Sequence, residues 1–154
     1  MKKFLLLIPF LGLMTSCTFT GGSSTPSTSS KTTTIQVKVN ASDWQYTNMA
    51  NNNYFYAGLD LSQITDKVFE KGEVKAYRVV DRYNAQKARK HLLPYVMHKE
   101  EYIGGQWVFW TETLDFTYGK GWVEFNLRAS DFAYELDATI NPEAMDFDIV
   151  ITEP

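Results

Sequence analysis

The stretch 111-TETLDFTYGKGWVEFNLR-128 predicts a β-hairpin, and this hairpin limits how the rest of the chain can fold. A two-residue loop of Gly119 and Lys120 fits a type II′ turn, because glycine at the first central position accepts a positive φ. Tyr118 then lies opposite Gly121. Since side chains alternate between the faces of a strand, this register places two apolar series on one face of the hairpin.

One carboxylate falls within that apolar face. The predicted cross-strand pairs on the face are Phe116 with Val123, Leu114 with Phe125, and Glu112 with Leu127. An unpaired carboxylate at position 112 would be costly to bury, so Glu112 needs a partner. Arg78 and Arg128 are the candidates for a buried ion pair, and a β-bulge that turns Glu112 outward is the alternative.

The same register predicts a like-charge pair on the outer face, where Asp115 lies opposite Glu124. Like charges at directly opposed positions destabilise a sheet by a few tenths of a kcal/mol or more. Neighbouring lysines or solvent screening would relieve the repulsion, and a bound cation is the alternative. We predict no metal site.

Period-two alternation recurs on both sides of the hairpin, in residues 35–39 and 145–151. Further strands are expected at residues 53–61, 73–80, 91–97, 107–118 and 131–138. In the segment 61-LSQITDKVFEKG-72, Ile64 and Val68 share one helical face and Gly72 suits the end of a helix. The chain therefore predicts an all-β fold, an antiparallel β-sandwich of about seven or eight strands with one short crossover helix.

Residues 1–16 read as a signal peptide, because two lysines precede an apolar run, residues 4–14, that is too short to cross a hydrocarbon core of about 30 Å. Residues 13–16 lead directly into Cys17, the only cysteine of the chain. This order resembles the lipobox of bacterial lipoproteins. The resemblance implies that Cys17 carries lipid on its thiol and begins the mature chain. A lone buried cysteine is the alternative.

Residues 17–34 are expected to form the lipidated cysteine and a tether, and residues 35–154 the β-sandwich module. After Cys17 the tether has twelve Ser or Thr among seventeen residues and would span roughly 20 to 25 Å as a flexible coil. Without the first 16 residues the chain has 13 basic and 18 acidic residues, a formal charge of −5. This charge disfavours nucleic acid as a partner.

The sequence contains no catalytic motif, so we expect no enzyme activity and no cofactor. Its two histidines, His91 and His98, do not match the spacing of a metal site. Trp107, Phe109 and Trp122 fall on the outward parity of their strands, where exposed rings can bind a ligand. A second layer or a long loop that covers these rings is the alternative.

Two functions follow from these features. The first is a lipid-anchored, exported interaction or structural module without catalytic activity, with an envelope protein as partner. The alternative is a carbohydrate-binding module that uses the exposed rings to bind a glycan. The membrane is the partner of the lipid on Cys17, and the sequence leaves the oligomeric state open.

The chain resembles a group of small uncharacterised lipoproteins of Bacteroidetes-type bacteria. The shared stretches, in order, are SDW (42–44), YFY (54–56), KGEV (71–74), LLPYV (92–96), TETLDF (111–116) and the FDIVI ending (147–151). The resemblance implies no activity. With Thr18 after the cysteine, it implies retention at the outer membrane, facing the periplasm. Many members carry a collagen-like Gly-X-Y stretch, which this chain replaces by the Ser/Thr tether, so no trimer is implied.

Overall fold

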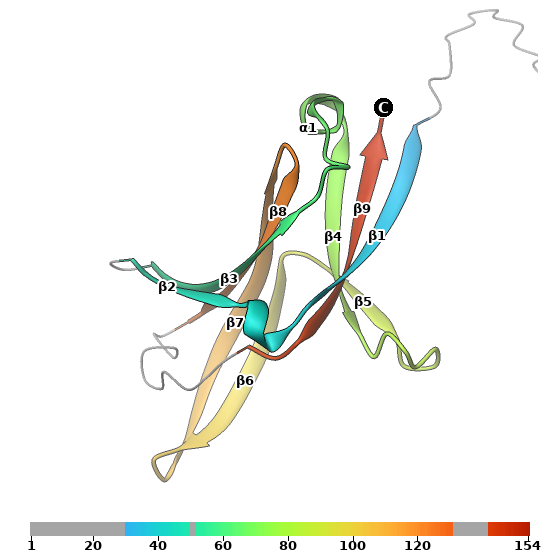
Figure 1. The fold of residues 1–154 in the computed structure, drawn as a ribbon. Helices are drawn as coiled ribbons and strands as arrows, with labels where there is room; N and C mark the ends of the chain where they lie inside the picture. Colours follow the sequence, from blue (N-terminus) through green and yellow to red (C-terminus); the bar gives the residue numbers. More distant parts are fainter. Residues whose placement is uncertain (1–29, 50–51, 131–141) are drawn as a thin grey trace, which may run out of the picture.

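The computed structural model describes residues 30–49, 52–130 and 142–154, which form two antiparallel sheets packed face to face (Figure 1). The four-stranded sheet has the order β1 (Lys31–Val39), β9 (Met145–Glu153), β4 (Glu73–Val80), β5 (Arg89–Leu92). The five-stranded sheet has the order β2 (Gln45–Met49), β3 (Asn52–Asp60), β8 (Trp122–Ala129), β7 (Gln106–Gly119), β6 (Tyr95–Ile103). The predicted antiparallel β-sandwich is confirmed.

Strand number and boundaries differ from the prediction at three places. The expected strand 91–97 is split between β5 and β6 at Pro94, which has no N–H to donate to a ladder. The described residues include β2, which was not predicted. β1 begins at Lys31 rather than at residue 35, because its threonines, a β-favouring residue type, pair with β9. The predicted strand 131–138, the signal peptide and Cys17 lie outside the described residues.

The short helix α1 (Asp66–Lys71) forms where the sequence predicts one, and closes one end of the sandwich (Figure 1). The Thr65 hydroxyl accepts a hydrogen bond from the Val68 backbone N–H and caps the first turn. Gly72 follows the last turn, and its amide donates to the Val68 carbonyl. Ile64 and Val68 are almost fully buried, but Ile64 precedes the helix, so the predicted sharing of one helical face by these two side chains was wrong.

The β7–β8 hairpin has the predicted faces and a different register. Its loop is Lys120-Gly121, so that Gly119 lies opposite Trp122 and Phe116 lies opposite Phe125. Gly121 has the positive φ, +79°. Gly119 lies under the Trp122 ring, and a Cβ added to Gly119 would lie 2.5 Å from the nearest ring atoms. Close packing against an indole, rather than a positive φ, explains the first glycine. Each strand residue therefore faces a partner two positions further along than predicted.

The corrected register removes the predicted like-charge pair. Asp115 lies opposite Asn126, and Thr117 lies opposite Glu124. The Asp115 carboxylate instead lies 3.6 Å from Nε of Arg128. A shift by two residues changes the partners and keeps every side chain on its face, so the burial predicted for the apolar series survives.

The core is built from the inward positions of β8, β7 and β9. Leu114, Val123 and Phe125 are fully buried, and Phe116 is partly buried against them. The Phe125 ring stacks on Phe147 of the opposite sheet, with ring centroids 3.8 Å apart. This contact joins the central strands of the two sheets.

The hairpin gives a paired stability prediction. Phe125→Ala should lower the free energy of unfolding by about 3 to 5 kcal/mol, because it removes a fully buried ring from the centre of the core. Trp122→Ala should cost about 1 kcal/mol or less, since the ring is 44% exposed at the turn. Urea denaturation of both variants measures the difference. Equal losses would contradict the assignment of these positions to opposite faces.

Candidate functional site

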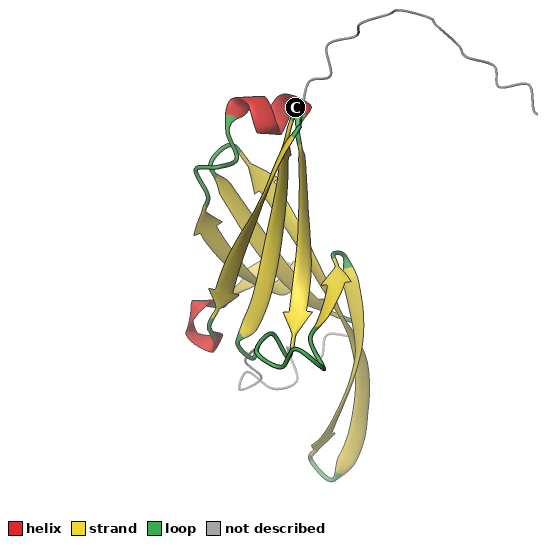
Figure 2. Ribbon diagram, turned by 90° about the vertical axis from the view of Figure 1, so that its right-hand side faces the viewer, coloured by secondary structure: helices red, strands yellow, loops and turns green. Residues whose placement is uncertain are grey.

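β6 and β7 continue beyond the rest of the five-stranded sheet as a two-stranded arm. The last residue of β7 that pairs with β8 at this end is Glu112, opposite Ala129, so the arm comprises residues 98–111, where β7 pairs with β6 alone. Gly104 and Gly105, with φ of +60° and +90°, form its turn, as two-residue hairpin loops of this kind require. Figure 2 shows the hairpin projecting past the other strands.

Three aromatic side chains lie on one face of the arm, and we call Tyr102, Trp107 and Phe109 the arm aromatic face. Their exposed fractions are 61%, 61% and 65%. Tyr102 lies directly opposite Trp107, and their ring centroids are 5.5 Å apart with the planes inclined by 62°. Glu100 lies opposite Phe109, so an acidic side chain borders the rings. The exposure predicted for Trp107 and Phe109 is confirmed.

Trp122 is also exposed but lies at the other end of the sheet. It faces Gly119, which is twelve residues along β7 from Trp107. At about 3.3 Å per residue the two indoles are therefore roughly 40 Å apart. The structure brings Trp107 and Phe109 together with Tyr102 and leaves Trp122 outside this group.

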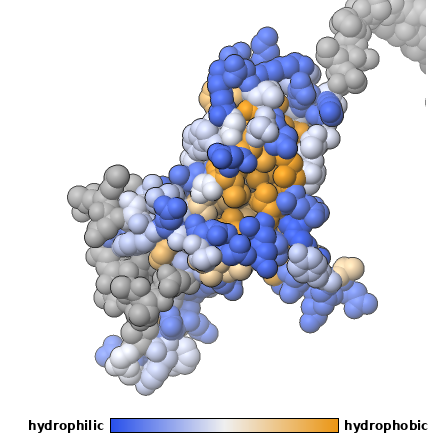
Figure 3. All heavy atoms as spheres, viewed as in Figure 1, coloured by the Kyte–Doolittle hydropathy of each residue, from blue (hydrophilic) through white to orange (hydrophobic). Residues whose placement is uncertain are grey.

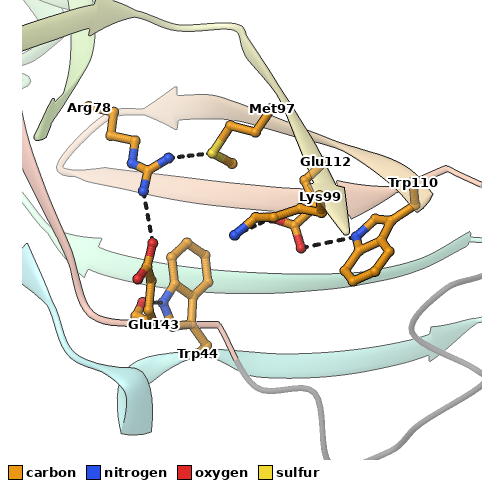
Figure 4. Close-up of polar contacts among 7 residues, drawn as sticks. All are labelled: Trp44, Arg78, Met97, Lys99, Trp110, Glu112 and Glu143. Carbon is orange, nitrogen blue, oxygen red and sulfur yellow. Dashed lines mark hydrogen bonds and ion pairs between the residues drawn. The ribbon is translucent and has the colours of Figure 1, made fainter. Parts of the chain in front are cut away.

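The opposite face of the arm's base carries a buried carboxylate (Figure 4). Glu112 is 5% exposed, on the core side of β7 as predicted. Its Oε1 accepts a hydrogen bond of 3.3 Å from Nε1 of Trp110, and its Oε2 lies 3.5 Å from Nζ of Lys99. The predicted partners Arg78 and Arg128 were wrong. β7 pairs continuously through this position, so no bulge turns Glu112 outward.

Both arginines have other partners. Arg78 of β4 reaches across the sandwich, where it donates to the Met97 sulfur of β6 and to Oε1 of Glu143 at 3.0 Å (Figure 4). The Arg128 guanidinium lies 4.1 Å from the centroid of the Tyr54 ring on the outer face. The contact between Arg78 and Met97 joins β6, near the base of the arm, to the opposite sheet.

A second charged cluster lies on the outer face of the four-stranded sheet. Asp148 is 1% exposed, and its carboxylate oxygens lie 2.7 Å from Nη1 of Arg82 and 2.7 Å from Nζ of Lys90. Arg82 also donates to the Phe147 carbonyl and lies 3.5 Å from Asp146. Burial alone would raise the pKa of Asp148, but the hydrogen bonds from Lys90 and Arg82 hold the pKa below its usual value.

The two histidines do not meet. The His91 ring stacks on Tyr95 at 4.2 Å between centroids, and His98 lies on the outer face of β6, opposite Thr111. Within residues 30–49, 52–130 and 142–154, no three His, Cys, Asp or Glu side chains are arranged to hold a metal ion. The helices of the described part of the chain are all too short or too polar to span a membrane.

Sequence reasoning missed Tyr102 and the cluster around Asp148. Tyr102 could have been found, because a two-residue loop at Gly104 and Gly105 places it opposite Trp107. The cluster could not, because Arg82 lies in a loop whose path does not follow from strand periodicity.

Asp148 generates a pH-dependent prediction. Asp148→Asn should lower the free energy of unfolding at pH 7 by about 3 kcal/mol, because it removes the carboxylate that pairs with the largely buried Arg82 guanidinium. A carboxylate with a lowered folded pKa stabilises the fold fully above its unfolded pKa of about 3.9, and this stabilisation is lost as the pH falls through the folded value. The difference in stability between the two proteins should therefore begin to shrink as the pH falls below about 4. A difference that stays constant from pH 7 to pH 3 in urea titrations would contradict the ionic role.

Comparison with protein-family models, with curated proteins and with solved structures finds no match to this chain.

Proposed function

We propose that this protein is a lipid-anchored, exported interaction module of the bacterial envelope without catalytic activity. Lipid on Cys17 holds it at the outer membrane, on the periplasmic side, and the arm aromatic face binds a protein of the envelope. The observation that carries this proposal is the exposure of Tyr102, Trp107 and Phe109, at 61% to 65%, on one face of a projecting arm.

The composition of the arm aromatic face supports a protein partner. Tyrosine, tryptophan and phenylalanine are enriched in protein interfaces, and tryptophan and tyrosine are frequent among the residues that dominate binding energy. Each ring buried against a partner gains about 25 cal/mol per Å² of apolar surface removed from water. Flanking Glu100 supplies the charged rim that such interfaces have.

The position of the arm relative to the anchor supports the same function. β1 begins at Lys31, which pairs with Glu153, so both sequence ends of the sandwich lie together (Figure 1). The arm projects from the opposite end. Nine-residue strands separate the two ends by roughly 30 Å. A tether that leads to Cys17 thus leaves one end of the module, and the arm is presented at the other.

Carbohydrate binding is the second candidate, supported by the exposed rings themselves. Sugar rings stack on flat aromatic surfaces, and a row of coplanar rings would favour this function. The rings of Tyr102 and Trp107 are inclined by 62°, and Trp122 lies far away, so the geometry favours a protein partner. A glycan array probed with the full-length protein distinguishes the two candidates.

The anchor is tested at Cys17. Cys17→Ala should move the protein from the detergent phase to the aqueous phase of a membrane extract, because acyl chains contribute about 0.8 kcal/mol per buried CH₂. Intact-mass analysis should find lipid on the wild-type chain alone. Thr18→Ala is the control and should stay in the detergent phase. A Cys17→Ala chain that partitions like wild type would refute the anchor.

The arm is tested by the double variant Trp107→Ala and Phe109→Ala. Used as bait in envelope extracts, it should recover the partner at least about tenfold less than wild type, because each lost ring is an expected hot spot. Its melting temperature should change little, since both rings are exposed. Trp122→Ala is the matched control and should recover the partner like wild type. Equal recovery by the double variant would contradict the proposed role of the arm.

A further inference from the structure

β1 is one of the two edge strands of the four-stranded sheet. Of the edge strands described, it has the fewest features that prevent pairing with another strand. Within residues 30–49, 52–130 and 142–154, β1 pairs with β9 and with no other strand. Its stretch 32-TTTIQV-37 contains no charge, proline or glycine. Uncharged strands of this kind, with a free row of N–H and C=O groups, readily accept another strand.

The other edges carry features that discourage pairing. β5 has four residues and β2 has five. β6 is long, but Lys99 on its inner face and two consecutive glutamates at 100 and 101 place charge along it. Short edges and inward-pointing charges are common means of preventing edge-to-edge association. β1 is distinguished by its length of nine residues and by the six uncharged residues between Lys31 and Lys38.

The sandwich is also open beside β1. Figure 3 shows apolar surface exposed between the two sheets, on the side where β1 and β3 lie in Figure 1. The apolar side chains of these strands that are only partly buried are Ile35, Val37 and Leu59. A cavity of about 190 Å³ also adjoins β1, and it is lined by Lys31, Thr33, Gln63, Thr65, Val68, Ile151 and Glu153. A strand added to β1 would cover this opening.

We propose that β1 pairs antiparallel with β1 of a second copy of this chain, around a two-fold axis at Gln36. The pairs between the copies are Gln36 with Gln36, Ile35 with Val37, Thr34 with Lys38, and Thr33 with Val39, each of the last three occurring twice. The two four-stranded sheets become one continuous eight-stranded sheet. Such an interface is isologous, because the same surface serves both copies.

The pattern of residues in β1 selects this register. With Gln36 at the axis, both Ile35 and Val37 meet an apolar partner, and Lys38 meets the uncharged Thr34. An axis at Ile35 would place Val37 opposite Thr33 and Val39 opposite Lys31. An axis at Val37 would leave five pairs within the strand. Three of those five pairs would be apolar, but the Gln36 register has seven pairs within the strand, two of them apolar, and it opposes no like charges.

The same symmetry covers the open side of each sandwich. Antiparallel neighbours in one sheet place their inner side chains on the same face, so the openings beside Ile35 and Leu59 in the two copies face each other. The apolar surface that one sandwich leaves exposed is thus covered by the other copy. This interface lies apart from the arm and does not depend on the lipid at Cys17.

Disulfide trapping in the full-length protein tests the pairing. Gln36→Cys should form a covalent dimer under mild oxidation, since the two residues at the axis lie within the Cα separation that a disulfide allows. Lys38→Cys is the matched control, equally exposed on the same face. Its two copies lie four residues apart along the strands, roughly 13 Å, and should not cross-link. Thr34→Cys mixed with Lys38→Cys should cross-link as a heterodimer.

The wild-type chain, which contains only Cys17, is the background control. If Cys17 itself cross-links, the comparison is made in a Cys17→Ala background, so failure of the anchor and failure of the pairing are separable. Cross-linking at Lys38→Cys equal to that at Gln36→Cys would overturn the proposed register.

A substitution that opposes like charges tests the dimer directly. Gln36→Lys should shift the detergent-solubilised full-length protein from dimer to monomer in sedimentation velocity, because position 36 is exposed and the two lysines would lie opposite each other at the axis. A wild-type protein that is monomeric at every concentration, or a Gln36→Lys protein that remains dimeric, would overturn self-pairing. A monomeric wild type would leave an extended segment of another protein as the strand that β1 accepts.

Discussion

The stacking of Phe125 on Phe147 is the contact on which the rest of the structure depends. It joins β8, the strand that follows the Lys120-Gly121 turn, to β9, the last strand of the chain, and so packs the two sheets against each other. Every other inward side chain of β8 and β9 is positioned by the same period-two alternation. Because no residue between Thr18 and Pro154 is a cysteine, no disulfide supports this region, and the described fold depends on packing.

The sequence predicts the face of the strand on which a side chain lies more reliably than it predicts the residue opposite on the neighbouring strand. Alternation in β7 and β8 identifies which side chains are buried, since a shift by two residues leaves each on the same side. It does not identify the residue opposite, because Gly119 and Gly121 are both plausible turn glycines. The two glycines are distinguished by the Trp122 ring, which packs over Gly119. The alternation of apolar and polar residues does not predict this contact.

The candidate site follows the same rule. Exposure of Trp107 and Phe109 could be predicted from parity, whereas the separation of Trp122 from them depends on which end of the sheet each occupies. The need of Glu112 for a cationic partner could be predicted from its burial, but its partner is Lys99 on the neighbouring strand. Partners across strands depend on register, and partners across sheets, such as Arg78 and Met97, depend on tertiary packing.

The antiparallel pairing of β1 with β9, from Lys31–Glu153 to Val39–Met145, also determines how the module would respond to force. A pull between a membrane on the Lys31 side and a partner at the arm acts along the strands rather than across them. The hydrogen bonds between β1 and β9 are then loaded together, in shear, instead of opening one after another. Such a geometry resists extension far better than one that unzips, so the edge strand that would follow the proposed tether is also the part of the sheet that would bear tension.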